Sequence, residues 1–523
     1  MAVSFERIPS NIRVPLFYVE ITNQLAGYFA MEQPAALIGP SLTGSFAALN
    51  EPVRVNSYAE AVELFGEGSI LADMVNTYRF NDSFGEIWCV PVAATGAVAA
   101  EGLLEFQGTA TQAGLISLNI GGDLVRVTVA RGADGAAIAT ATVEAINGML
   151  GGLVSADSTT VGEVELTARQ PGALGDDILI QEVELPPPGI TITIVPMANG
   201  AGVADVGAAM TALGDETYDF IGLAYSDAAA LDAVEAALND VAGRWAWDRQ
   251  SYGHAFTARM GTANDLATFG RTRNDPHVTI AGYPPSATPP WRVTAAWLAQ
   301  AAVSLRVDPA RPLQTLPLVG VLPPHRAQVF TRQQMQVLLN SGIAPANPIV
   351  TGEMQIIRSI TSYQRNRWNQ PDPSWLDIQT PFTLMYFVRF MRGRILQKFP
   401  RHKLASDGAV FGPGQAIVTP RIVRAELLAA YDELQRGGLV EDIDSFDRLL
   451  IVERNANDPN RIDVLASPDL VNQLRILAML VAFRLQTTAL PPGTLAAPFM
   501  SPMVYARAPA GPLPARSPQQ PTA

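Results

Sequence analysis

The stretch AALIGPS, residues 35–41, is an apolar run that ends in a Gly-Pro turn, a pattern that predicts a short buried strand. SYAEAVELFG at 57–66 predicts a helix, with Ser57 as its N-cap and Glu60 completing a capping box. EIWCVPV at 86–92 predicts a second buried strand. A strand, a helix and a strand in this order predict an α/β layer.

The composition changes after this layer. Residues 95–185 are rich in Gly, Thr and Ala, and they include LISLNIGGDLVRVTV (115–129), which predicts a hairpin around its Gly-Gly pair. After PPP at 186–188, the segment ITITIVPM (190–197) and the helices and strands that follow it restore the alternating pattern. Residues 95–185 are therefore expected to form a β-rich domain inserted into the α/β domain.

The pattern changes again from residue 381. Long helices are predicted for PFTLMYFVRFMRGRILQKF (381–399) and VTPRIVRAELLAAYDELQRGG (418–438). RLLIVER (448–454) and RIDVLAS (461–467) predict two strands joined by a turn-rich loop. Ser467 then caps an expected helix over PDLVNQLRILAMLVAFRL, with Pro468 at its first position.

The expected fold class is thus α/β (α+β) and multi-domain: an α/β core with an inserted β-rich domain, and a C-terminal α/β domain with a hairpin and long helices. Extended arms are expected at both ends of the chain. The predicted boundaries are an N-terminal arm 1–22, an α/β domain 23–94 and 186–380, the insertion 95–185, a C-terminal α/β domain 381–490, and a C-terminal extension 491–523.

Charge and composition exclude several classes of protein. The 523 residues carry a formal net charge of −13, which argues against a general nucleic-acid or membrane-surface binder. The single cysteine, Cys89, rules out an intramolecular disulfide. The most apolar run, ILAMLVAF at 476–483, is too short to span a membrane, and MAVSFERIP does not begin a signal peptide. We therefore expect a protein made in a cytoplasm, without membrane insertion.

The chain shows no motif typical of catalysis. It contains neither a P-loop nor a G-x-S-x-G elbow. NGAGVADVG at 199–207 lacks the dinucleotide-binding spacing and favours a turn that leads into a helix. Asp176 and Asp177 could bind a cation, but such a pair more often caps a turn. The four histidines are never paired at helical spacing, which speaks against a zinc site; they are His254, His277, His325 and His402. No catalytic, metal or cofactor-binding residue is predicted.

Several stretches together resemble one family, the sheath proteins of contractile phage tails, of the Mu-like type. They span most of the chain in the expected order: SFERIPSNIRVPLFYVEI (4–21), LFGEGSILADMVNTYRFNDSFGEIWCVPV (64–92), LTARQPGALGDDILI (166–180), MTALGDETYDFIGLAYSD (210–227) and NRIDVLASPDLVNQLRILAMLVAFRL (460–485). The resemblance implies a subunit, not an enzyme, that polymerises helically with copies of itself around a tail tube protein, needs no cofactor, and belongs to the virion after assembly in the host cytoplasm. It also implies baseplate and tail terminator proteins as partners.

The resemblance further implies that extended arms donate strands to neighbouring subunits. In NIRVPLFYVEI (11–21), four residues alternate to one face, and Pro15 limits the strand to a sheet edge. The arm residues are Ile12, Val14, Leu16 and Tyr18. An edge strand on the chain's own first domain remains an alternative. Because two strands alone are marginally stable, the C-terminal hairpin is the expected receiver. Its apolar residues are Leu450, Val452, Ile462 and Val464.

Two opposite charge runs lie in the C-terminal domain. Residues 389–403 contain six basic and no acidic side chains, whereas residues 432–447 contain six acidic side chains and one basic. Either run could be a solvated helix face, but in a polymer we expect contact with the tube or with a neighbouring subunit. The residues concerned are Arg389, Arg392, Arg394, Lys398, Glu441, Asp442 and Asp444. The sheath of a phage-derived bacterial injection device, such as a tailocin, and a nucleotide-dependent α/β enzyme remain alternatives.

Overall fold

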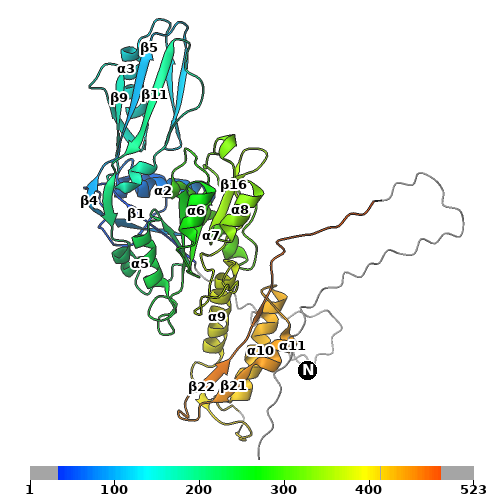
Figure 1. Ribbon diagram of the computed structural model, residues 1–523. Helices are drawn as coiled ribbons and strands as arrows, with labels where there is room; N and C mark the ends of the chain where they lie inside the picture. Colours follow the sequence, from blue (N-terminus) through cyan, green and yellow to red (C-terminus); the bar gives the residue numbers. More distant parts are fainter. Residues whose placement is uncertain (1–32, 413, 484–523) are drawn as a thin grey trace, which may run out of the picture. The chain divides into compact units, whose positions relative to one another are not determined.

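The structure is a computed structural model, and it describes residues 33–412 and 414–483. Its largest sheet, of which Figure 1 labels β1 and β16, has the strand order β17-β16-β15-β14-β13-β1-β3-β2. The neighbours from β3 to β16 pair in parallel, whereas β2 and β17 are antiparallel edge strands. The strands are β1 (Ala35–Pro40), β2 (Val53–Arg54), β3 (Ile87–Val92), β13 (Phe220–Leu223), β14 (His254–Met260), β15 (Val278–Tyr283), β16 (Ala344–Pro348) and β17 (Met354–Ile356).

Helices cover this sheet and bury most of its strands. Every residue of β1, β13 and β15 is buried, as expected for parallel strands packed on both faces. The longest of these helices, α7, packs against α2, β13 and β14 and buries Trp291 and Trp297. The helices are α1 (Tyr58–Phe65), α2 (Ile70–Asn81), α4 (Val206–Ala212), α5 (Ala228–Leu238), α6 (Ala263–Gly270), α7 (Pro290–Val307) and α8 (Arg332–Leu339), with 3-10 turns η1 (Ala173–Asp177) and η2 (Arg326–Gln328).

The first helix begins and ends where the sequence predicts. The Ser57 side chain accepts a hydrogen bond from the Glu60 N–H, and the N–H of the C-cap residue Gly66 bonds to the Val62 carbonyl. The Glu60 carboxylate, however, accepts from the backbone N–H of Asn56 rather than from that of Ser57, so the expected capping box is displaced by one residue. The displaced contact has the same effect as a capping box, because a backbone N–H near the helix start, here that of Asn56, finds an acceptor.

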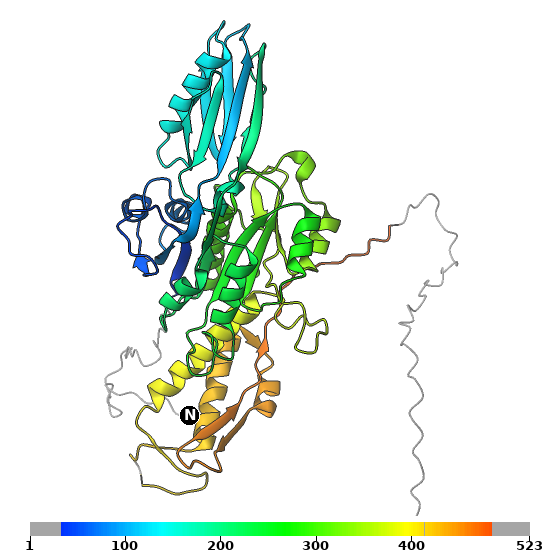
Figure 2. The same cartoon turned by 60° about the vertical axis from the view of Figure 1, so that its left-hand side comes forward.

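The chain between β3 and α4 forms antiparallel sheets packed around one helix, α3 (Figure 2). The predicted hairpin is confirmed: β6 and β7 pair, and Gly121 and Gly122 both have positive φ, as the tight turn requires. The elements are β4 (Ala94–Val98), β5 (Glu101–Gly108), β6 (Gly114–Ile120), β7 (Asp123–Val129), α3 (Gly135–Asn147), β8 (Val154–Asp157), β9 (Glu163–Ala168), β10 (Ile180–Glu182), β11 (Ile190–Ala198) and β12 (Ala201–Ala204).

The strand ITITIVPM does not return to the α/β sheet. It lies in β11, which pairs with β5, and β12 then pairs with β4. The expectation that the alternating pattern resumes directly after residue 188 is therefore wrong for these strands. Exposed and covered residues mix along β11, which is typical of an antiparallel strand with one solvated face. The chain rejoins the parallel layer with α4 and β13.

Residues beyond the sheet form a second apolar core between two long helices, α9 (Gln379–Lys398) and α10 (Pro420–Arg436). Both helices lie where the sequence predicts them. The strand expected at 448–454 starts only at Ile451, because α11 occupies Ile443–Leu449. The remaining elements are β18 (Lys403–Leu404), β19 (Ile417–Val418), β20 (Val440–Glu441), β21 (Ile451–Arg454), β22 (Ile462–Leu465) and β23 (Asp469–Leu470).

The helix expected after Ser467 is absent from the described residues. Asp469 and Leu470 instead pair with β20, and residues 471–483 have no regular secondary structure. A helix in water depends on burying its apolar face. The apolar side chains of 474–483 are between 70% and 94% exposed, so this segment buries no apolar face of its own; they are Leu474, Ile476, Leu477, Met479, Leu480, Val481 and Phe483. Among the described helices, none is long and apolar enough to cross a membrane.

Candidate functional site

The C-terminal hairpin is a two-stranded sheet with open edges. Strands β21 and β22 pair with each other in antiparallel register, from Ile451 opposite Leu465 to Arg454 opposite Ile462. In the described residues neither strand has a second partner. An open edge presents unpaired N–H and C=O groups, and two strands alone are marginally stable in water. This hairpin can therefore accept a further strand on either side.

The four residues predicted for the receiving hairpin share one face of it. Val452 and Val464 lie opposite each other, and Leu450 and Ile462 are each two positions away along their strands. Val452 and Ile462 pack against the second core, and Leu450, which directly precedes β21, is buried. A donated strand would therefore meet the hairpin through its main-chain edges, while these side chains face the helices of their own chain.

An apolar cavity of about 440 Å³ lies between this hairpin and the two long helices. Ile462 and Val464 of β22 line it, together with Met391 of α9 and Leu427 of α10. The hairpin thus covers its helices incompletely, which is consistent with a sheet that is not finished within the described residues.

Arg389, predicted to contact the tube or a neighbour, is paired within its own chain. It donates two hydrogen bonds to Asp219: Nη1 lies 2.6 Å from Oδ2, and Nη2 lies 2.7 Å from Oδ1. The Asp219 side chain is fully buried at the start of β13. Arg389 therefore fixes α9 to the parallel sheet.

Arg394 and Lys398 are also paired internally. Arg394 Nε lies 2.6 Å from Oε1 of Glu426, and Lys398 Nζ lies 2.5 Å from Oε2 of the same carboxylate. Arg394 also bonds to Glu433, which belongs to the acidic run. Burial raises the pKa of Glu426, but the hydrogen bonds from Lys398 and Arg394 outweigh it and hold that pKa below its usual range. The two charge runs thus meet, in part, within one subunit.

Other charged candidates are more exposed. Within the described part of the chain, Arg392 donates only to the Gln250 side chain, at 3.3 Å. Glu441 and Asp444 are exposed, and Asp442 caps α11 by accepting a hydrogen bond from the Ser445 N–H at 3.0 Å. Of the predicted basic residues, Arg392 therefore has the guanidinium most available to another protein.

The sequence did not predict that Asp219 and Glu426 are partners of the basic run. A signal exists for Glu426, because it lies among apolar residues on the face of α10 that is predicted to be buried. No local signal exists for Asp219, which is 170 positions from Arg389. The arm residues Ile12, Val14, Leu16 and Tyr18, and the extension 491–523, lie outside the described residues.

The two buried histidines, His254 and His277, contact a hydroxyl group and an aromatic ring of the core. His254 Nε2 lies 2.9 Å from the Thr279 hydroxyl, and His277 stacks on Trp245 with ring centroids 4.2 Å apart. Burial lowers the pKa of His277 to about 3, so this ring is neutral at physiological pH. Among residues 33–412 and 414–483, no three His, Cys, Asp or Glu side chains form a group that could hold a metal ion.

NGAGVADVG does not form a phosphate-binding loop. It contains β12 and then Asp205, whose side chain caps α4 by accepting from the Ala208 N–H. The neighbouring Asp176 accepts a hydrogen bond from the Gly200 N–H at 2.7 Å, in a cap-like role. Both observations agree with a structural role for residues 199–207 and for Asp176.

The chain is similar to known proteins over most of its length. Residues 199–362 match the family model of the phage tail sheath protein central domain, and residues 370–484 match that of the phage tail sheath C-terminal domain. The chain is 38% identical over 497 residues to the Mu-like prophage FluMu tail sheath protein of Haemophilus influenzae, which covers 92% of this chain and 100% of that protein.

Solved structures with a similar course of the chain are more distant. One is the sheath tail protein of Desulfitobacterium hafniense, 11% identical, with a TM-score of 0.46, covering 88% of this chain and 100% of that one. Another is the helical sheath of the anti-feeding prophage in its contracted state, 12% identical, with a TM-score of 0.46, covering 90% and 99%.

Proposed function

Since this chain belongs to the family of phage tail sheath proteins, we propose that many copies of it polymerise helically around a tail tube and contract to drive that tube through a host envelope. The observation that carries the proposal is the 38% identity that extends over the whole length of the Mu-like relative. A match of this extent includes the C-terminal hairpin and its helices, where the strand edges are open.

Strand donation would join the subunits of this polymer. The N-terminal arm, with Ile12, Val14, Leu16 and Tyr18, is the proposed donor, and the edges of β21 and β22 are the proposed receivers. Main-chain hydrogen bonds supply affinity in such a sheet, and they persist when two bodies rotate about flexible joints beside it. The free energy for contraction would then come from subunit interfaces that improve between two packings, without a nucleotide.

Partners follow from the same proposal. The tail tube protein would contact the C-terminal domain, with Arg392 as the available basic residue, and baseplate and tail terminator proteins would close the two ends. Subunits would assemble in the host cytoplasm and remain in the virion tail.

Negative-stain electron microscopy of the purified full chain tests the polymer. Long hollow helical tubes are expected, because sheath subunits associate head-to-tail through a heterologous interface that does not close. A preparation containing only discrete monomers or dimers at every protein concentration would contradict the proposal.

A further inference from the structure

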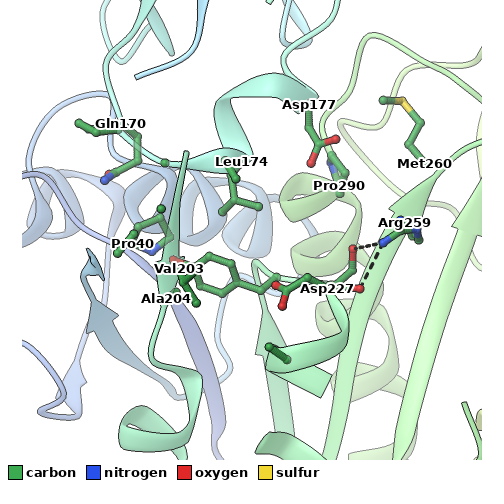
Figure 3. A pocket seen from close by; sticks show the side chains of 18 residues that line it. Pro40, Gln170, Leu174, Asp177, Val203, Ala204, Asp227, Arg259, Met260 and Pro290 are labelled. Carbon is green, nitrogen blue, oxygen red and sulfur yellow. Dashed lines mark hydrogen bonds between the residues drawn. The ribbon is translucent and has the colours of Figure 1, made fainter. Parts of the chain in front are cut away.

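A cavity of about 530 Å³ lies away from the C-terminal hairpin. It is located where β1, β13 and β14 end, between the parallel sheet and the segment around η1 (Figure 3). Gln170, Leu174 and Asp177 face it from the insertion, whereas Asp227 and Arg259 face it from the sheet. This volume falls within the range of pockets that hold small organic molecules.

The position of the cavity in the sheet topology is typical of ligand sites. Strand β1 has β3 on one side and β13 on the other. The chain leaves β1 toward β3 and later returns on the opposite side with β13, so the strand order reverses at β1. In open α/β sheets, ligands bind outside the carboxyl ends of the strands at such a switch point.

Three polar groups at the cavity have no hydrogen-bond partner in the described part of the chain. The Tyr225 hydroxyl and the Gln170 Oε1 have no hydrogen-bond partner among the described residues. Both residues are less than 10% exposed, so these atoms are also shielded from solvent. Neither carboxylate oxygen of Asp177 forms a hydrogen bond or ion pair with a described residue. Buried polar groups in folded proteins are nearly always paired, so the Tyr225 hydroxyl and the Gln170 oxygen, with the half-buried Asp177 carboxylate at the same cavity, are a reason to expect a bound molecule.

Two of the unpaired groups lack donors, whereas the Tyr225 hydroxyl can either donate or accept. The Gln170 oxygen can only accept hydrogen bonds, and the Asp177 carboxylate can only accept them while it is ionised. The guanidinium that lines the cavity, that of Arg259, forms no hydrogen bond to these three groups: its Nη1 bonds to the Ser226 carbonyl at 3.3 Å, and it stacks over the Phe269 ring at 4.2 Å. A ligand that satisfies these acceptors must therefore bring N–H groups. A positive charge on the ligand would strengthen its binding to the Asp177 carboxylate.

We infer that this cavity binds a small organic cation, an amine or a guanidine, through Asp177, Gln170 and Tyr225. The assignment is independent of the proposed polymer, since it rests on a different part of the chain. An ammonium or guanidinium group would bond to the Asp177 carboxylate and the Gln170 oxygen, and the aliphatic part would lie against Leu174 and Val203.

Protonation of Asp177 gives the site a pH dependence. Burial raises the pKa of this carboxyl to about 6, with Asp176 adding to the rise and Arg259 opposing it. The other titratable side chains at the site are Asp227, which caps α5, and Tyr225; Tyr283 of β15 also interacts with Asp177. Cation binding is therefore expected to weaken about tenfold between pH 7.5 and pH 5, because the carboxylate is mostly protonated at the lower pH.

The test uses agmatine as the probe and saturation-transfer NMR on the full chain. Wild-type protein should show saturable binding at millimolar agmatine. Asp177→Asn should raise the Kd about tenfold, and Tyr225→Phe by a few-fold, because each removes one group that the ligand satisfies. Glu184→Gln is the matched control: it removes one exposed carboxylate of the insertion outside the cavity and should leave the Kd unchanged.

The inference is overturned if wild-type protein shows no saturable binding of agmatine, or if Asp177→Asn binds it as tightly as wild type does. An equal loss in the Glu184→Gln control would also overturn it, since that result indicates general attraction to an acidic protein. Should Asp177→Asn fail to fold, Tyr225→Phe decides the matter, because it keeps the aromatic ring and removes only the hydroxyl.

Discussion

The guanidinium of Arg389 lies across the fully buried carboxylate of Asp219 in a bidentate pair, with N–O distances of 2.6 and 2.7 Å. Arg389 belongs to α9, and Asp219 directly precedes β13 of the parallel sheet. The Arg389 guanidinium also lies 5.4 Å from the centre of the Tyr252 ring. The helix that leads into the hairpin region is therefore anchored to the sheet by a buried ion pair.

Replacing Arg389 tests this anchor. Arg389→Ala leaves the Asp219 carboxylate buried without its partner, so we expect the free energy of unfolding to fall by about 3–5 kcal/mol. Urea denaturation of the unassembled subunit measures the change. Arg392→Ala, on the same helix and bonded only to Gln250, is the control and should change stability by less than about 0.5 kcal/mol. Equal effects of the two variants would show that the buried pair contributes nothing specific.

The neighbouring basic residues separate folding from assembly. Reversal of Arg394 places a third carboxylate beside Glu426 and Glu433, so Arg394→Glu is expected to lower stability by about 2 kcal/mol. Reversal of Arg392 should leave stability nearly unchanged and weaken assembly on the tube. Sheath length measured by electron microscopy, together with urea denaturation, distinguishes the two effects. Unchanged sheath length with Arg392→Glu would show that this guanidinium contacts only solvent and Gln250.

Deletion of residues 1–20 tests strand donation. An arm that pairs only with neighbouring subunits contributes little to its own core, so the truncated chain should keep its circular dichroism spectrum. Assembly should be lost, because every subunit interface then lacks a strand. A truncated chain that unfolds or aggregates would show that the strand belongs to its own domain.

Burial of His277 predicts a loss of stability in acid. Because desolvation lowers its folded-state pKa to about 3, while an unfolded histidine titrates near 6.5, protons bind preferentially to the unfolded chain below pH 6.5. The stability that this ring contributes is present above pH 6.5 and is lost as the pH falls, by about 2 kcal/mol at pH 5. His277→Phe preserves the ring stacking on Trp245 and removes the titrating group.

The variant should therefore lose about 2 kcal/mol less stability than wild type between pH 7 and pH 5, as measured by urea denaturation at both values. Asp275, whose pKa burial raises to about 6, titrates in both proteins and cancels in the comparison. Identical pH profiles would mean that His277 is already solvated in the folded state.

Local patterns predicted much of this fold. The buried strands β1 and β3, the Ser57 cap, the Gly-Gly hairpin and the helices α9 and α10 all follow from composition and spacing over a few residues. The helix expected after Ser467 was wrong for the described residues: the spacing of its apolar residues looks helical in sequence, but Asp469 and Leu470 pair with β20 instead. Strand β11 was assigned to the wrong sheet because pairing with β5 is a long-range choice.

For the charged residues of the C-terminal domain, too, local features could be predicted from the sequence, whereas long-range contacts could not. Counting charges located both runs, but it could not show that Arg389 pairs with Asp219, because the sequence alone does not bring residues so far apart together. The cavity at the switch point was likewise invisible: Gln170, Tyr225 and Arg259 come from separate elements and share no motif. Only the folded topology brings these groups together.

A cryo-electron microscopy reconstruction of the assembled full chain shows directly whether subunits share sheets. We predict a hollow helical tube in which density on the open edges of β21 (Ile451–Arg454) and β22 (Ile462–Leu465) belongs to strands from other subunits. A reconstruction in which both edges are covered by strands of the same chain, or in which subunits meet without any shared sheet, would contradict it.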